Sequence, residues 1–175
     1  IDTCVWEEVQ QRLITASGRT RGQMNAAHPS PLAGKLYDET GDRLTPSHAN
    51  KNGKRLRYYV SRRLVIDKTE KHPDAWRLPA LQLEKTIAQA ARDHFAKQSI
   101  LANLVEDLKA NEVARLDKKL GSLARMFSSQ KTVQGWSYLI ERIDITPGHL
   151  VVQLDATAIA EQLALPVERL SADAL

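Results

Sequence analysis

The residues best suited to chemistry in this chain are the positively charged side chains of one segment, RLTPSHANKNGKRLRYYVSRR, residues 43–63. The segment holds seven Lys or Arg residues, no Asp or Glu, and the pair Tyr58 and Tyr59. Duplex DNA carries condensed counterions along its phosphates, and a basic surface that displaces them gains affinity from their release. The composition therefore favours contact with a nucleic-acid backbone. The competing interpretation is a charged hairpin that is merely solvated.

An Asn-Gly pair in this segment predicts a tight β-hairpin turn with cations near the tip. Lys51 and Lys54 flank the turn, and strand alternation places Arg55 and Arg57 on one face. Arginine can read guanine with two hydrogen bonds, and a tyrosine hydroxyl can contact a phosphate. One tyrosine of the pair is expected in the hairpin core, and either could fill that place. The expected DNA-binding residues are Lys51, Lys54, Arg55, Arg57, Tyr58, Tyr59, Arg62, Arg63, Arg43 and His48, with Arg19, Arg21 and Lys35 as secondary candidates.

Other kinds of active site lack residues of the right type and spacing. A structural zinc site needs four ligands at close spacing, but the chain has one cysteine, Cys4, and five scattered histidines. No Gly-x-Ser-x-Gly, His-Glu-x-x-His or phosphate-binding glycine loop is present. Asp38 and Glu39 are adjacent acids in a segment typical of a turn. We therefore expect no metal, no cofactor and no catalytic residue, and an independent enzyme is the least favoured hypothesis.

Apolar periodicity and turn residues indicate the elements that position the basic segment. In chain order we expect a helix at 2–15, strands at 32–38, 43–50 and 55–61, helices over 80–128 with a break near Asn111, a hairpin at 143–154, and a helix at 156–165. Pro46 favours an edge position or a bulge for the second strand. The fold class is α+β: a small antiparallel β-ribbon, a helical, coiled-coil-like segment and a C-terminal β-hairpin.

The second half of the helical region contains an apolar seam at 3-4-3-4 spacing, formed by Val113, Leu116, Leu120, Leu123 and Phe127. Two heptads are too few for an isolated coiled coil. An intramolecular core is therefore favoured for residues 99–127, and a seam between two copies of the chain stays open as the alternative.

Composition and charge fit a soluble globular protein, with 26% charged residues and 42% apolar ones. The net charge of +4 is uneven, because residues 1–80 carry 14 Lys or Arg against 9 Asp or Glu, and the remainder carries 11 against 12. No signal peptide or membrane span is expected. The single cysteine indicates a reducing, cytoplasmic setting, and the absence of Met at position 1 suggests a piece of a longer protein.

Residues 30–65, SPLAGKLYDETGDRLTPSHANKNGKRLRYYVSRRLV, resemble the recombinase zinc-ribbon region of large serine site-specific recombinases, the resolvase and DNA-invertase family of bacteria and phages. IDTCVWEEVQQRL is similar to the helix that ends the preceding recombinase domain, and IERIDITPGHLVVQLD to the family's C-terminal tail. The resemblance implies three regions: a terminal helix and linker at 1–28, a zinc-ribbon-like β domain at 29–75, and a helical region with the hairpin and a short helix at 76–175.

By this resemblance the chain would be a DNA-binding, nucleoid-associated fragment that positions the recombinase on its attachment site, with the catalytic serine domain absent. Many members carry a Cys-x-x-Cys-Gly knuckle in the first ribbon turn and further cysteines after the tyrosine pair, where this chain has DETG and Ser61. The ribbon is therefore expected to lack zinc and to depend on apolar packing. Leucine-rich helices often join subunits in this family. The alternative is thus a helical interaction module that forms a homo-oligomer through residues 99–127.

Overall fold

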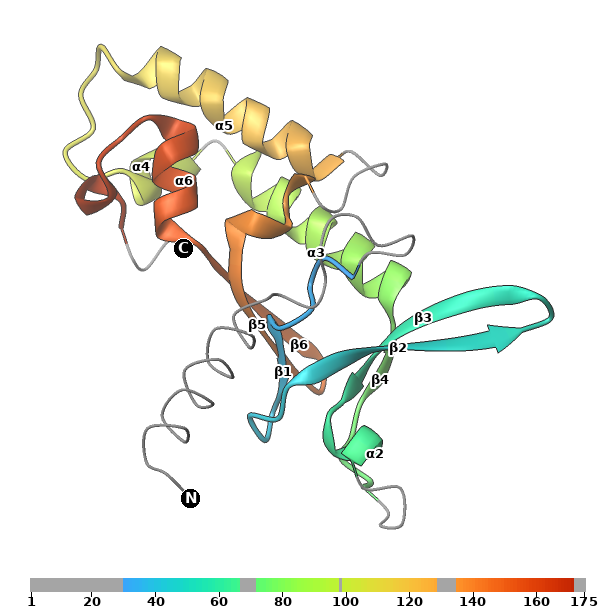
Figure 1. Ribbon diagram of the computed structural model, residues 1–175. Helices are drawn as coiled ribbons and strands as arrows, with labels where there is room; N and C mark the ends of the chain where they lie inside the picture. Colours follow the sequence, from blue (N-terminus) through green and yellow to red (C-terminus); the bar gives the residue numbers. More distant parts are fainter. Residues whose placement is uncertain (1–29, 67–71, 98, 129–134, 172–175) are drawn as a thin grey trace, which may run out of the picture. The chain divides into compact units, whose positions relative to one another are not determined.

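The computed structural model describes residues 30–66, 72–97, 99–128 and 135–171, and its fold class is α+β, as predicted (Figure 1). The predicted helix at 2–15, with Cys4, Arg19 and Arg21, lies outside the described residues. Across the described ranges no helix is long and apolar enough to cross a membrane. The elements in chain order are β1 (Leu36–Asp38), β2 (Leu44–Lys51), β3 (Lys54–Ser61), α2 (Arg63–Ile66), β4 (Arg77–Pro79), α3 (Ala80–Phe95), α4 (Ile100–Leu104), α5 (Val113–Ser128), η2 (Ser137–Leu139), β5 (Ile140–Thr146), β6 (His149–Leu154), α6 (Ala156–Leu163) and η3 (Val167–Arg169).

The predicted Asn-Gly hairpin is confirmed, with β2 and β3 paired antiparallel from Lys51↔Lys54 at the tip to Leu44↔Ser61 at the base. Asn52 and Gly53 both adopt positive φ, 51° and 71°, which is the backbone that a two-residue type I′ turn requires. The second sheet has the order β2-β3-β4, so β2 is an edge strand and accommodates Pro46 as expected.

The first predicted strand of the ribbon has a different partner from the one expected. β1 pairs in parallel with β5, aligning Leu36 with Ile143, and the short strand β4 completes the ribbon instead. Both aligned side chains are buried, so the pairing places apolar residues from distant parts of the chain in one core. The expectation that residues 32–38 form a full strand of the antiparallel ribbon is therefore wrong, because β1 joins it only through one isolated bridge, between Tyr37 and Arg43.

Lys35, a secondary candidate for DNA contact, has a structural role at the start of β1. Its ammonium donates to the carbonyl oxygens of Ser137, at 3.0 Å, and Ile140. Burial lowers the pKa of Lys35 from its ordinary value, and the Asp155 and Glu141 carboxylates act in the opposite direction. These contacts fasten β1 to the segment that leads into β5, which removes Lys35 from the set of DNA-binding candidates.

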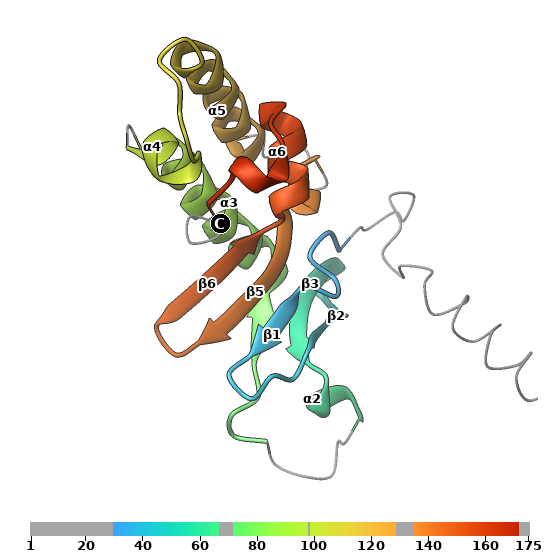
Figure 2. The same cartoon turned by 90° about the vertical axis from the view of Figure 1, so that its left-hand side faces the viewer.

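The predicted apolar seam packs inside the molecule, where α5 lies antiparallel beside α3 (Figures 1 and 2). Leu116, Leu120, Leu123 and Phe127 are buried, whereas Val113 is 40% exposed. The Phe127 ring stacks on Phe95 with centroids 5.8 Å apart. The favoured intramolecular interpretation is thus confirmed, and these four side chains are not available to join a second copy. The predicted break near Asn111 is also present, between α4 and α5, and another break separates α3 from α4.

Residues Pro31–Leu175 form one compact unit. The predicted boundary between residues 75 and 76 is crossed by the β1–β5 pairing, by the β3–β4 pairing and by one continuous apolar core. Leu32, Leu36, Leu44 and Tyr59 of the expected metal-free ribbon core join this larger core with Ile87 of α3. The ribbon therefore obtains the support of neighbouring helices that a small core without zinc was expected to need.

The start of α5 is fastened to the C-terminal η3 by a paired ion contact that makes stability depend on pH. Glu112 accepts from Arg169 at 3.0 and 2.9 Å, and these hydrogen bonds lower the pKa of Glu112 from 4.5 to about 2. A depressed native pKa stabilises the fold above the ordinary pKa, and this contribution is lost as the pH falls from about 4.5 to about 2. We expect Glu112→Gln to have a lower melting temperature than the unchanged protein at pH 7, and the same melting temperature near pH 2. Thermal melts at the two pH values measure this, and Glu168→Gln, at an exposed position, is the control. An equal decrease in melting temperature at both pH values would contradict the prediction.

Candidate nucleic-acid interface

The outer part of the β2–β3 hairpin, residues 48–57, extends beyond the rest of the compact unit, and we call it the finger (Figure 1). β4 pairs only with Tyr58, Tyr59 and Val60 of β3, so the sheet has three strands at its base and two along the finger. Every side chain from Asn50 to Arg55 is exposed. This geometry presents the tip cations to solvent on a narrow ribbon.

Strand alternation divides the hairpin into two faces with different surroundings. The inner face carries Arg55, Arg57 and Tyr59 of β3, which lie opposite Asn50, His48 and Pro46 of β2. The outer face carries Lys54, Leu56 and Tyr58, which lie opposite Lys51, Ala49 and Ser47. The expected sharing of one face by Arg55 and Arg57 follows from this register, and it is the face whose base lies against α3.

The tyrosine that fills the core is Tyr59, which is fully buried. Its hydroxyl donates to Glu84 at 2.8 Å and accepts from the Leu32 backbone N–H at 3.3 Å. Burial, and then the adjacent Glu84 carboxylate, raise the pKa of Tyr59, so the phenol keeps its proton. The expectation that Tyr59 contacts DNA is therefore wrong, because the side chain is enclosed. Tyr58 lies on the outer face, with the Arg77 guanidinium 4.7 Å from its ring centroid.

Two of the expected DNA-binding arginines are bound to carboxylates of the protein itself. Arg57 donates to Glu84 at 2.7 Å, and Glu84 is 1% exposed. Arg63 pairs with Asp38 at 2.7 Å and with Asp42 at 3.3 Å. Both arginines are therefore structural in this conformation, since a phosphate contact would have to displace an ion pair with a buried carboxylate.

The remaining expected cations are exposed at two places. Lys51, Lys54 and Arg55 lie at the finger tip, and none of them forms an ion pair with any carboxylate in the described ranges. Arg43 and Arg62 are exposed at the hairpin base, where the Arg62 N–H donates to the Arg43 carbonyl at 3.0 Å. His48, also exposed, lies on the inner face opposite Arg57. The arrangement concentrates positive charge at the tip, where phosphate groups of a duplex could be neutralised without unfavourable contacts from nearby acids.

Sequence reasoning did not identify Glu84, Arg77 or Asn50 as parts of this region. The sequence contains a signal for Glu84, because this residue lies on the apolar stripe of α3 between Leu83 and Ile87. A carboxylate at such a position needs a buried partner. Arg77 gave no such signal, because its place over Tyr58 depends on the pairing of β4 with β3.

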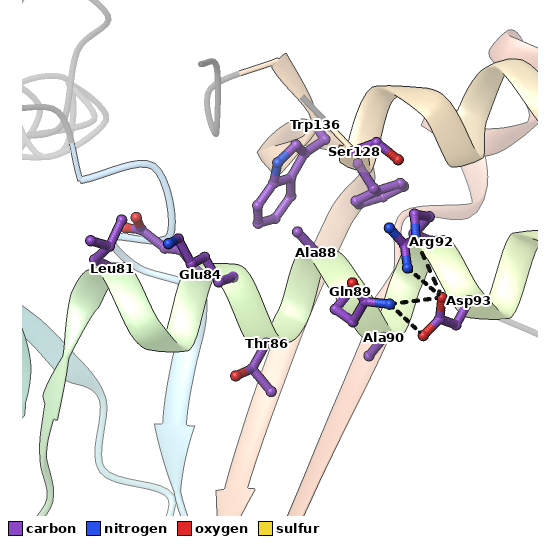
Figure 3. A pocket seen from close by; sticks show the side chains of 12 residues that line it. Leu81, Glu84, Thr86, Ala88, Gln89, Ala90, Arg92, Asp93, Ser128 and Trp136 are labelled. Atoms are coloured by element: carbon purple, nitrogen blue, oxygen red, sulfur yellow. Dashed lines mark hydrogen bonds and ion pairs between the residues drawn. The ribbon is translucent and has the colours of Figure 1, made fainter. Parts of the chain in front are cut away.

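A pocket of about 700 Å³ lies beside α3 and is bounded by Trp136 and Phe127 (Figure 3). The Thr86 and Ser128 hydroxyls there each donate to a carbonyl one turn earlier in the helix, at 3.1 and 3.2 Å. Asp93 accepts hydrogen bonds from neighbouring side chains of the same helix. Each of these polar groups has its hydrogen-bond partner within its own helix, and they form no pair of nucleophile and base. Within the described residues, no three His, Cys, Asp or Glu side chains are grouped so that they could hold a metal.

Comparison with known proteins identifies no relative: no family model, curated protein or solved structure matches this chain. The resemblance of residues 30–65 to serine recombinases therefore stays a prediction from the sequence.

Proposed function

We propose that the finger binds double-stranded DNA, and that this chain is the DNA-binding C-terminal region of a serine site-specific recombinase, which it positions on an attachment site. The observation that carries the proposal is the exposed finger tip, where Lys51, Lys54 and Arg55 project with no acidic residue in the surrounding segment 43–63. Arg43 and Arg62 extend the cationic surface to the hairpin base.

The recombinase part of the proposal rests on the resemblance of residues 30–65, and the chain departs from that family at the zinc ligands. Here Ser61, in place of a cysteine, donates to Asp38 at 2.8 Å and accepts from the Trp76 N–H at 2.9 Å. Hydrogen bonds thus occupy a position where family members carry a cysteine. A resolvase-type catalytic domain encoded directly before Ile1 would strengthen this part, and an unrelated domain there would restrict the proposal to DNA binding.

Reversing the three tip charges, as Lys51→Glu, Lys54→Glu and Arg55→Glu together, is expected to abolish duplex binding at moderate salt. The unchanged chain should lose affinity steeply with salt, with a log–log slope of about 0.9 for each phosphate contact. Arg57 is left unchanged because its reversal would disrupt the ion pair with Glu84. Fluorescence anisotropy with a labelled duplex, from low salt upward, measures both quantities.

The matched control for this experiment reverses three exposed lysines outside the finger and so gives the same change in net charge: Lys85 of α3, Lys97 of the loop after α3, and Lys118 of α5. We expect the control variant to retain most of its affinity, because its altered charges lie away from the finger. Equal losses in both variants would show that net charge alone governs binding, and unchanged binding by the tip variant would refute the proposal.

A further inference from the structure

The two faces of the finger carry different kinds of polar side chain nearest the tip. Lys51 and Lys54 lie directly opposite each other on the outer face. Asn50 and Arg55 form the next cross-strand pair and lie on the inner face. All four side chains are exposed. The turn and the strand register therefore place two lysines on the outer face, and one asparagine and one arginine on the inner face.

This division matches two kinds of contact with a duplex. Arginine can donate two hydrogen bonds to guanine, and asparagine can form two with adenine, so both types distinguish base edges in the major groove. Lysine is a flexible point charge suited to a phosphate, whose position carries no sequence information. The inner pair is thus suited to selecting bases and the outer pair to holding the backbone.

The dimensions of the finger fit the major groove. That groove is about 12 Å wide and admits a two-stranded β-ribbon. Asn50 and Arg55 are directly opposed across the strands, and such residues have Cβ atoms about 4.5–5.5 Å apart, a distance between one and two base-pair steps of about 3.4 Å each. Asn50 and Arg55 are both exposed, so the inner face is open to solvent around them. Arg57, next along that face, is held by Glu84.

We propose that the finger enters the major groove with its inner face toward the bases, where Arg55 selects a guanine and Asn50 an adenine, while Lys51 and Lys54 hold flanking phosphates. This inference rests on the proposed function, because it requires that the finger bind a duplex. It adds the groove and a base preference, and it assigns a role to Asn50.

Selection of duplexes from a random-sequence pool by the full chain tests this inference. The bound pool should be enriched in a short motif with a guanine and an adenine close together. Arg55→Lys keeps the charge but loses the two-bond geometry, so we expect it to reduce the guanine preference about 5- to 150-fold with little change in the salt slope. Asn50→Ala should reduce the adenine preference by a similar factor. Lys51→Ala and Lys54→Ala should instead weaken binding to all sequences and lower the slope by about one each.

The outcomes separate this inference from the proposed function. Base reading would be overturned if binding depended steeply on salt but no motif were enriched. It would also be overturned if a motif were enriched and neither Arg55→Lys nor Asn50→Ala changed it. In both cases duplex binding itself would still be supported. Absence of any duplex binding at low salt would overturn both. Equal affinity for an RNA duplex would also overturn the inference, because the major groove of A-form RNA is too deep and narrow for side chains to read.

Discussion

Replacing Glu84 by alanine is expected to destabilise the fold by about 3 kcal/mol, near the lower end of the range for breaking a buried ion pair. Glu84 is 1% exposed and accepts from Arg57 at 2.7 Å and from Tyr59 at 2.8 Å. Alanine would leave the Tyr59 hydroxyl in an apolar core without its acceptor. The Arg57 side chain is 21% exposed and can partly regain water, which limits the loss. Urea unfolding followed by circular dichroism measures the free-energy difference.

Two variants with smaller expected effects serve as controls for Glu84. Tyr59→Phe removes two hydrogen bonds, the one to Glu84 and the one from the Leu32 N–H, and keeps the ring in the core, so we expect a cost of about 2 kcal/mol. Thr86→Ala alters an exposed residue of the same helix and should have little effect. Should Glu84→Ala unfold at the same urea concentration as Thr86→Ala, the buried carboxylate would not be stabilising, and the connection between the finger base and α3 would be mainly apolar.

The local parts of this fold could be predicted because short sequence signals determine them. The Asn-Gly pair fixed the turn, and through it the complete register of β2 and β3, since a two-residue loop leaves no freedom in pairing. The C-terminal hairpin followed in the same way from alternation and a turn at Gly148, and α6 followed from its apolar residues before Pro166. In the structure Asp155 caps this helix and accepts from the Ala158 N–H at 2.9 Å. In each case the residues that decide the structure are near neighbours in the chain.

The errors arose where a partner lies far away in sequence. β1 is only three residues long, and its pairing with β5 is decided by the burial of Leu36 against Ile143, which no local pattern of either segment indicates. The same holds for the candidate site, because the carboxylates that bind Arg57 and Arg63 belong to α3, to the last residue of β1 and to the turn that follows it. Counting charges in residues 43–63 therefore overestimated the cations available to an external partner. The tip residues were predicted correctly as exposed, because no other element extends that far.

Asp38 illustrates the same point, since its place in a turn was predicted but its burial was not. Its first carboxylate oxygen accepts from the Thr40 hydroxyl at 2.6 Å and from the Thr40 and Asp42 backbone N–H groups. Its second oxygen accepts from Ser61 at 2.8 Å and pairs with Arg63 at 2.7 Å. Burial alone would raise the pKa of Asp38, but the hydrogen bonds together lower it below its ordinary value. One charged group thus joins β1, β3 and α2.

Asp38→Ala is expected to cost about 3–5 kcal/mol of folding free energy, because it removes the charge opposite Arg63 and leaves the Ser61 hydroxyl without its acceptor in the interior. Asp38→Asn keeps an acceptor for the turn N–H groups but places an amide NH₂ against Ser61 and Arg63, so its cost should be intermediate. The adjacent exposed Glu39→Gln removes the same charge and should change stability by less than about 0.5 kcal/mol.

The dependence on pH distinguishes the charge of Asp38 from its shape. Because the native pKa lies below the ordinary value, the ionised carboxylate stabilises the fold above that value, and the stabilisation is lost as the pH falls through the native pKa. The gap in unfolding free energy between the unchanged protein and Asp38→Asn should therefore narrow on acidification, whereas Glu39→Gln should show no comparable narrowing. A gap that stays constant down to the acid limit of folding would mean that packing of the side chain, and not its charge, joins the three elements.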